Sequence, residues 1–227
     1  MSARSLAGFS SMATRHILTE LTRDYELQTG VRVEIRSMGG VEAAKLVRAG
    51  EATDIVALAS KVMGDLEAEG HIAKGSARDF ARSEIGIAVR AGLVLPSVAD
   101  ELGVKRAMLD ATKICYSTGP SGDHLKALCE KWGVPLTRAL VAPPGVPVAT
   151  LVANGEADLG FQQLSELIGQ PGIQIAGPLP PEIQAVTVFS AGIATRSRNL
   201  ESALGFVAYL ASSETGDAKR RYGMEPA

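Results

Sequence analysis

The stretch TGVRVEIRSMGGVEAAKLVRAGEATDIVALAS, residues 29–60, carries the clearest fold signal in the chain. Residues 31–35 alternate apolar and polar side chains, as a half-buried strand does, and residues 54–59 form a short apolar run typical of a buried strand. Between them, residues 41–49 have the apolar spacing of a helix, which ends at Gly50. A strand, a helix and a second strand in this order predict a mostly parallel sheet covered by helices.

The same alternation continues on both sides of this stretch. Upstream, a strand beginning near residue 4 precedes a helix over 14–28, which ends at Thr29-Gly30 as a helix C-cap does. Downstream, strands alternate with helical segments to the end of the chain. The predicted strands are 85–89, 113–116, 140–141, 157–161 and 186–194, and the predicted helices are 60–69, 97–109, a segment ending at Trp132, 148–153, 200–210 and 215–222.

The composition is that of a globular protein with a real core. The 227 residues are 46% hydrophobic and 21% charged, with a formal net charge of −2. Such a charge gives no bulk attraction to nucleic acid or to a membrane surface, and 4% aromatic residues argue against a base-stacking platform. We therefore expect no nucleic-acid partner.

The N-terminal residues lack the apolar segment of a signal peptide, and no stretch approaches 18 uninterrupted apolar residues. The sequence as it stands thus predicts a cytoplasmic protein with no membrane insertion. A chain from which an export signal had been removed would instead be periplasmic. Cys115 and Cys129 are expected to be buried free thiols, and no metal or organic cofactor has a recognisable site.

A second informative stretch is CYSTGPSGDH, residues 115–124, in which an apolar strand runs into a loop of small residues that opens a helix. Backbone N–H groups at a helix start, together with serine and threonine hydroxyls, can hold an anion without a formal positive charge. The same residues also suit an ordinary helix N-cap with turn residues. The loop lacks the Gly-Lys-Ser/Thr ending of a nucleotide-binding P-loop.

Three blocks in order resemble the type II periplasmic solute-binding proteins, particularly their molybdate-binding group: residues 29–60, VANGEADLGFQQLSEL (152–167) and SALGFVAYLASSETGDAKRRYGM (202–224). The resemblance implies an α/β fold of two lobes, each a mixed, mostly parallel sheet flanked by helices, with a ligand cleft between the lobes. Lobe one would comprise 1–83 plus 187–227, and lobe two 84–186.

In this resemblance, five loops at the strand ends would supply the ligand-binding groups. The implied ligand-binding residues are Ser10, Ser11, Gly39, Gly40, Ser60, Ser117, Thr118, Gly119, Ser121, Gly122, Gly145, Val146 and Gln163.

The chain departs from the molybdate-binding pattern at two of these loops. By this resemblance, Gly39 and Gly40 stand where the molybdate-binding proteins have a run of serines, and Gln163 stands where they have a tyrosine. Both changes make room and remove hydroxyls that would hold a compact tetrahedral anion. The expected ligand is therefore a small organic di- or tricarboxylate rather than a molybdate-type oxyanion.

Three functions stay open on this scaffold. The first is a solute-binding protein that would deliver its anion to the permease of an ABC transporter, if it is exported. The second is an isomerase of a small polycarboxylate, similar to the aconitate isomerase-like members of this scaffold, in which His124 and Lys61 would transfer protons. The third is a ligand-sensing module. Fold alone does not decide among them.

Overall fold

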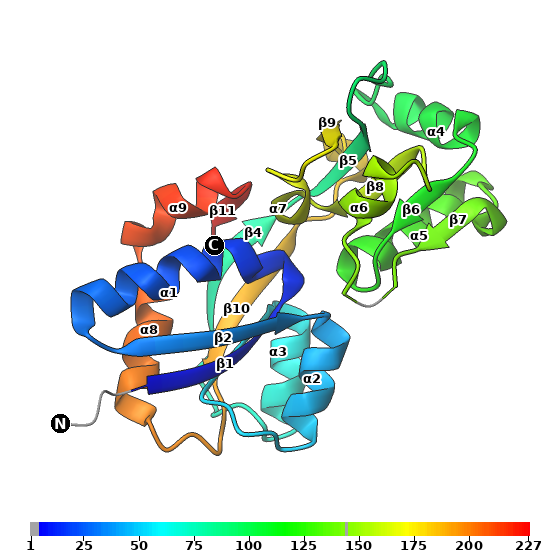
Figure 1. The fold of residues 1–227 in the computed structure, drawn as a ribbon. Coiled ribbons are helices and arrows are strands. Elements are labelled where there is room, and N and C mark those ends of the chain that lie inside the picture. Colours follow the sequence, from blue (N-terminus) through cyan, green and yellow to red (C-terminus); the bar gives the residue numbers. More distant parts are fainter. Residues whose placement is uncertain (1–4, 144) are drawn as a thin grey trace. The chain divides into compact units, whose positions relative to one another are not determined.

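The computed structural model describes residues 5–143 and 145–227, which form two compact units. Unit 1 combines Met1–Arg82 with Val188–Ala227, and unit 2 is the continuous segment Ser83–Thr187. Each unit contains one sheet with mixed strand directions and helices on its faces (Figure 1). The α/β fold class predicted from the sequence is confirmed.

The sheet of unit 1 has six strands in the order β11-β4-β10-β3-β1-β2. Strand β1 pairs in parallel with β2 and β3, whereas β10 runs antiparallel to β3. The strand–helix–strand order predicted for residues 29–60 is confirmed as β2, α2 and β3. The strands are β1 (Ser5–Ser11), β2 (Arg32–Met38), β3 (Ile55–Ala59), β4 (Arg78–Ser83), β10 (Thr187–Ile193) and β11 (Met224–Pro226).

Helices cover both faces of this sheet. On one face, Ile17 and Phe206 belong to a single buried cluster with the strands; on the other, Met63 packs in a second cluster. Burying each such side chain contributes about 1.5–3 kcal/mol. Figure 1 shows α1 and α8 apart from α2 and α3 on the sheet. The helices of unit 1 are α1 (Arg15–Thr29), α2 (Gly40–Arg48), α3 (Ser60–Ala68), α8 (Leu200–Ala211) and α9 (Gly216–Arg221).

The sheet of unit 2 has five strands in the order β7-β6-β8-β5-β9. Strands β6, β7 and β8 are parallel, and β5 is antiparallel to both β8 and β9. Its strands are β5 (Ile85–Arg90), β6 (Ile114–Tyr116), β7 (Ala139–Val141), β8 (Leu159–Gln163) and β9 (Ile173–Pro178). Its helices are α4 (Glu101–Asp110), α5 (Pro120–Trp132), α6 (Val148–Ala153) and α7 (Leu164–Leu167).

Several element boundaries predicted from the sequence were wrong. The helix expected from residue 97 begins at Glu101, because Asp100 is its N-cap and accepts a hydrogen bond of 2.7 Å from the Gly103 N–H. Ser10 and Ser11, expected in a loop, are the last residues of β1. Strands β4, β9 and β11 had not been predicted.

The expectation of two buried free thiols is confirmed for Cys115 and Cys129. Burial raises the pKa of Cys115 to about 12 and raises that of Cys129 as well. Both thiols therefore stay protonated at neutral pH, which leaves them poor nucleophiles. No helix within the described residues has the length and apolar character that crossing a bilayer requires.

Lys219 is a cation within the core of unit 1. Its side chain is 1% exposed, and Nζ donates a hydrogen bond of 2.8 Å to the Leu210 carbonyl at the end of α8. Burial lowers its pKa from 10.5 to about 8. Between these two values the unfolded chain holds more protons at this position than the folded chain, so the free energy of unfolding rises with pH.

We expect the substitution Lys219→Met to remove this pH dependence. Between pH 7.5 and pH 10, the free energy of unfolding of the wild type should rise by about 1–3 kcal/mol relative to that of the variant. The melting temperature of the wild type should rise with it. The Leu210 carbonyl keeps a hydrogen bond from the Thr215 hydroxyl, so the variant should fold. Parallel melting-temperature profiles for the two proteins across this range would contradict the assignment.

Candidate functional site

The sheet of unit 1 gathers its predicted ligand-binding residues at one edge. Because β1, β2 and β3 are parallel, their carboxyl ends meet there, with Ser10 opposite Ser37 and Ser11 opposite Met38. The antiparallel β10 brings Phe189 opposite Ala59 at the same edge. The edge is followed directly by the N-termini of α2 and α3.

The hydroxyls of Ser10 and Ser37 lie next to each other at the ends of β1 and β2. Ser10 Oγ lies 2.8 Å from Ser37 Oγ, and Ser10 is fully buried. Ser11 is 8% exposed, and its Oγ lies 3.5 Å from Thr14 Oγ1. Ser37 belongs to one of the five predicted loops but was not among the predicted ligand-binding residues.

The first turn of α2 presents backbone N–H groups at the same edge. Gly39 is the N-cap, and no side chain hydrogen-bonds there. The first backbone bond of the helix runs from Ala43 N–H to the Gly39 carbonyl at 2.9 Å, so the N–H groups of the first turn have no acceptor within the helix. A Cβ at Gly40 would lie 3.9 Å from Ser11 Cβ, which places this turn beside the end of β1.

The start of α3 carries a hydroxyl–carboxylate cluster. Ser60 Oγ lies 2.9 Å from Asp79 Oδ1 on β4 and 2.5 Å from Ser190 Oγ on β10. Ser190 Oγ also donates to Asp79 Oδ1 at 2.5 Å. Lys61 follows Ser60 and is exposed. Asp79 and Ser190 were missed by sequence reasoning because they lie on strands far from Ser60 in the chain.

In unit 2, the parallel strands β6, β7 and β8 likewise end at one edge, with Tyr116 opposite both Val141 and Phe161. Helix α5 begins there with Gly119 as N-cap, in a conformation with φ of 108° that favours glycine. A Cβ at Gly122 would lie 1.9 Å from the Ser117 carbonyl oxygen, so only glycine allows this tight approach.

The other predicted residues of this turn differ in exposure. Ser121 is 2% exposed, Ser117 is half-buried and Thr118 is exposed. The first backbone bond of α5 runs from Asp123 N–H to the Gly119 carbonyl, which leaves the N–H groups of Ser121 and Gly122 without an acceptor in the helix. These two N–H groups are the donors that the first turn of α5 presents.

Gln163, the last residue of β8, presents an unpaired polar atom. It is 3% exposed, and its Nε2 donates to Thr187 Oγ1 at 2.8 Å. Its Oε1 is buried without a hydrogen-bond partner among the described residues. An unpaired buried acceptor costs about 1–3 kcal/mol. Since the Thr187 hydroxyl can donate or accept, a rotated amide would present a donor in the same place.

Two predicted residues, His124 and Val146, have backbone partners. His124 Nε2 donates to the Ile183 carbonyl at 2.7 Å. The Val146 N–H donates to the Pro143 carbonyl, and Gly145 is exposed with φ of 79°. Pro144 of this loop lies outside the described residues.

The N-terminus of the short helix α6 is already occupied. The Val148 N–H donates to Gln162 Oε1 at 3.2 Å, and Gln162 Nε2 donates to Glu166 Oε1 at 2.7 Å. The loop after β7 therefore offers an anion fewer donors than the turn before α5. In the parts of the chain that the structure describes, no three His, Cys, Asp or Glu side chains form a possible metal site.

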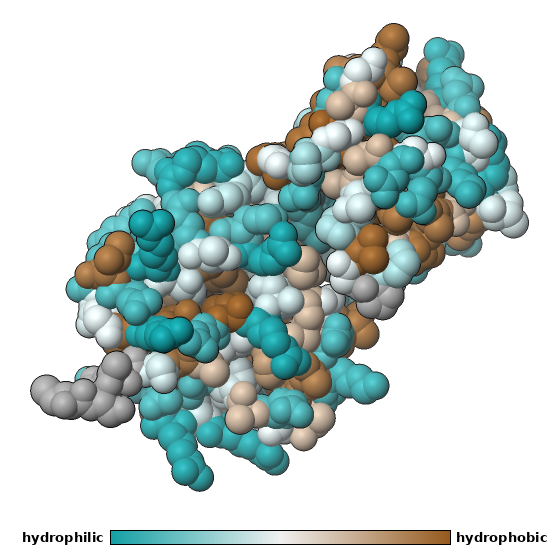
Figure 2. All heavy atoms as spheres, viewed as in Figure 1, coloured by the Kyte–Doolittle hydropathy of each residue, from teal (hydrophilic) through white to brown (hydrophobic). Residues whose placement is uncertain are grey.

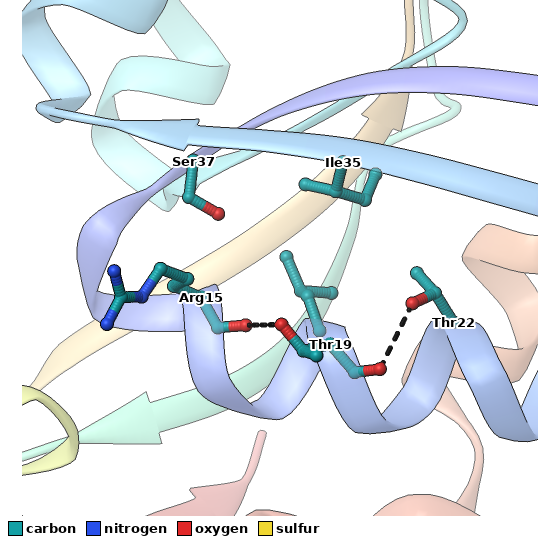
Figure 3. A pocket seen from close by; sticks show the side chains of 6 residues that line it. Arg15, Thr19, Thr22, Ile35 and Ser37 are labelled. Atoms are coloured by element: carbon teal, nitrogen blue, oxygen red, sulfur yellow. Dashed lines mark hydrogen bonds between the residues drawn. The ribbon is translucent and has the colours of Figure 1, made fainter.

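A pocket of about 190 Å³ adjoins the hydroxyl pair in unit 1 (Figure 3). Arg15 and Ser37 lie at the same end of it. The hydroxyls of Thr19 and Thr22 donate to carbonyls within α1, so the guanidinium of Arg15 is the strongest donor at this pocket. The lining residues are Arg15, Leu18, Thr19, Thr22, Ile35 and Ser37.

A larger hollow of about 720 Å³ lies in unit 2 and is lined mainly by residues 96–99 and 176–181. Beside it in sequence, Val94 is 94% exposed, and Figure 2 shows hydrophobic atoms at the surface over the turn that follows β5. None of the predicted ligand-binding residues lines this hollow.

Comparison with known proteins agrees with this arrangement. The family model described as bacterial extracellular solute-binding protein matches residues 6–225. A curated relative, aconitate isomerase from Pseudomonas sp, is 34% identical over 232 residues, covering 98% of this chain and 88% of that protein.

Two solved structures have the same fold at low identity. The periplasmic molybdate-binding protein of Azotobacter vinelandii has a TM-score of 0.77 and 21% identity, covering 96% of this chain and 98% of that one. PEB3 of Campylobacter jejuni, in a structure with bound L-phospholactate, has a TM-score of 0.71 and 14% identity, covering 97% and 99%.

Proposed function

Because the chain belongs to the family of bacterial extracellular solute-binding proteins, we propose that it binds a small polycarboxylate of the aconitate class and isomerises it by proton transfer. The observation that carries this proposal is the 34% identity to aconitate isomerase over 98% of the chain. The predicted preference for an organic acid over a molybdate-type oxyanion, made from Gly39, Gly40 and Gln163, points the same way.

The groups at the edge of unit 1 suit carboxylate binding. First-turn N–H groups of α2 and α3, that of Ser60 included, and the hydroxyls of Ser10 and Ser11 would donate hydrogen bonds to carboxylate oxygens in place of water. Arg15, at the pocket of about 190 Å³, would pair with a further carboxylate. A tricarboxylate needs a separate set of donors for each of its carboxylate groups, whereas a tetrahedral oxyanion needs one set of donors.

The donors of unit 2 would act on the same class of ligand. We propose that the N–H groups of Ser121 and Gly122 and the hydroxyls of Ser117 and Thr118 bind carboxylate oxygens. Gly119 would serve through its backbone conformation, and the exposed loop containing Gly145 and Val146 would contribute surface rather than hydrogen bonds.

Isomerisation moves a proton from one carbon to another while the double bond shifts between them. The carbanion that forms is delocalised onto a neighbouring carboxylate, where N–H donors stabilise the added charge. Lys61, exposed beside Ser60, is proposed to return the proton to the second carbon. His124 is proposed only as a secondary donor or acceptor, since its Nε2–H is committed to the Ile183 carbonyl.

A second candidate function is that of a receptor without chemistry, in which the bound anion would be passed to the permease of an ABC transporter. It is favoured by the hydroxyl and N–H groups at the carboxyl ends of the strands in both units, which suit reversible capture. The two candidates share the ligand class and differ in whether the ligand is changed.

One experiment separates the candidates. The purified protein is melted with molybdate, tungstate, citrate, cis-aconitate and trans-aconitate, and the aconitates are then incubated with it and followed by NMR. A ligand at 100 times its Kd adds about 2.7 kcal/mol of stability, which is visible in the melting temperature. We expect stabilisation by tricarboxylates and interconversion of the aconitates. Stabilisation without interconversion would leave the receptor, and stabilisation by molybdate or tungstate alone would overturn the proposal.

A substitution at Gln163 tests the ligand contact in unit 2. We expect Gln163→Leu to change the melting temperature of the free protein little, since it removes a buried unpaired atom but also the hydrogen bond to the Thr187 hydroxyl. Affinity for the polycarboxylate should fall about 5- to 30-fold, the range of one lost hydrogen bond. Thermal melting with and without ligand measures both effects. A variant that is destabilised but binds normally would assign Gln163 to structure alone.

A further inference from the structure

Asp79, Ser60 and Ser190 form a closed triangle of oxygen atoms. The Ser60–Asp79, Ser60–Ser190 and Ser190–Asp79 distances are 2.9, 2.5 and 2.5 Å. The three residues come from α3, β4 and β10, so the cluster exists only in the folded unit 1. Ser190 is 3% exposed, Ser60 is half-buried and Asp79 is exposed.

The hydroxyls of Ser60 and Ser190 hold the Asp79 carboxylate in one orientation. Each hydroxyl supplies one hydrogen, and both can donate to Asp79 Oδ1. The carboxylate is therefore positioned by side chains from α3 and β10.

Asp79 takes part in no ion pair within the described residues. The adjacent Arg78 donates to the carbonyls of Gly75 and Ala77. A carboxylate at an edge otherwise lined with anion-binding groups weakens the capture of an anion. The Asp79 carboxylate would contribute to function at this edge if it reacted with the ligand.

We propose that Asp79 is the catalytic base of this site, with Ser60 and Ser190 as the hydroxyls that position it; this inference rests on the proposed isomerase function. A C–H bond of the bound polycarboxylate breaks, its proton passes to the Asp79 carboxylate, and its electron pair is delocalised onto the adjacent carboxylate through the shifting double bond. A proton then returns to the other end of the three-carbon unit, from Asp79 or from Lys61, with solvent restoring the charge states. No oxidant, reductant or other reactant is consumed.

The test compares Asp79→Asn with the wild type and with Asp217→Asn. The asparagine keeps the size of Asp79 and one acceptor oxygen for the serine hydroxyls but removes its basicity. Asp217 is a 90% exposed carboxylate on α9, paired with Arg220, and serves as the matched control. We measure aconitate interconversion, exchange of substrate C–H for deuterium in D₂O by NMR, and ligand-induced thermal stabilisation.

We expect Asp79→Asn to lower both interconversion and deuterium exchange by at least about 100-fold, the usual range for loss of a general base, while ligand stabilisation stays within about threefold in Kd. Ser190→Ala, which keeps the carboxylate, should lower the rate by about 10-fold and serves if Asp79→Asn does not fold. The Asp217→Asn variant should match the wild type.

The outcomes are distinct. A wild-type protein that stabilises with polycarboxylates but neither interconverts nor exchanges them would overturn the isomerase function and this inference with it. An active wild type whose Asp79→Asn and Ser190→Ala variants keep full exchange would overturn only the role of Asp79.

Discussion

Replacement of Gly39 by aspartate is expected to abolish anion binding while making the protein more stable. Gly39 is the N-cap of α2, its φ of −56° is accessible to any residue, and a Cβ there would meet no atom within 4 Å. Aspartate is a favoured N-cap, and its charge interacts well with the helix dipole, so stability should rise by about 0.5–1 kcal/mol. The same carboxylate would occupy the first-turn N–H groups.

The loss of affinity should be large because a fixed negative charge then faces the ligand. Like charges brought together at a binding site cost several kcal/mol, and about 2.7 kcal/mol is already 100-fold in Kd. Calorimetric titration with the ligand that stabilises the wild type measures the affinity, and thermal melting measures the stability. Gly39→Ala is the control and should bind within about threefold of the wild type. An aspartate variant that binds as well as this control would remove α2 from the site.

The second large effect is expected from Gly122→Ala in unit 2. The new Cβ would lie 1.9 Å from the Ser117 carbonyl oxygen and 3.0 Å from Tyr116 Cδ2, so the turn before α5 must open. Forced overpacking of this kind costs about 3 kcal/mol, which exceeds the 0.5–1 kcal/mol that alanine gains in a helix. The melting temperature should fall by roughly 6–12 °C.

The displaced turn should also lose its anion-binding donors. We therefore expect Gly122→Ala to weaken polycarboxylate binding by at least about tenfold in the protein that remains folded at 20 °C. Gly64→Ala is the matched control, because Gly64 is exposed within α3 and its Cβ would meet nothing within 4 Å. It should raise stability by about 0.5–1 kcal/mol. A Gly122→Ala protein that melts within about 1 °C of the wild type would contradict the tight turn.

The fold was predictable from the sequence where structure is local. The alternation in residues 31–35 and the apolar run 54–59 identified two strands, because each pattern depends on which side chains face the core. Strand β4 escaped prediction since Arg78, Asp79 and Arg82 interrupt its apolar pattern. It forms because the sheet of unit 1 supplies neighbours on both sides.

The candidate site was predictable only in part for the same reason. Ser10, Ser11, Gly39 and Gly40 belong to loops and strand ends whose composition signals a turn or a helix start. Asp79 and Ser190 carry no such signal. They become part of a cluster only because the folded sheet brings Ser190 next to Ser60, which is 130 residues away in the sequence. A contact between residues so far apart in the sequence cannot be recognised from either segment alone.

The division of the chain also has a consequence for biosynthesis. Unit 2 is continuous, so it can complete its fold on the ribosome once residue 187 has emerged. Unit 1 cannot, because β10 pairs with β3 and begins 132 residues after β3 begins. Until then β3 has an open edge that could pair with another nascent chain. A chaperone that shields this edge would protect the protein during the interval in which only half of it is folded.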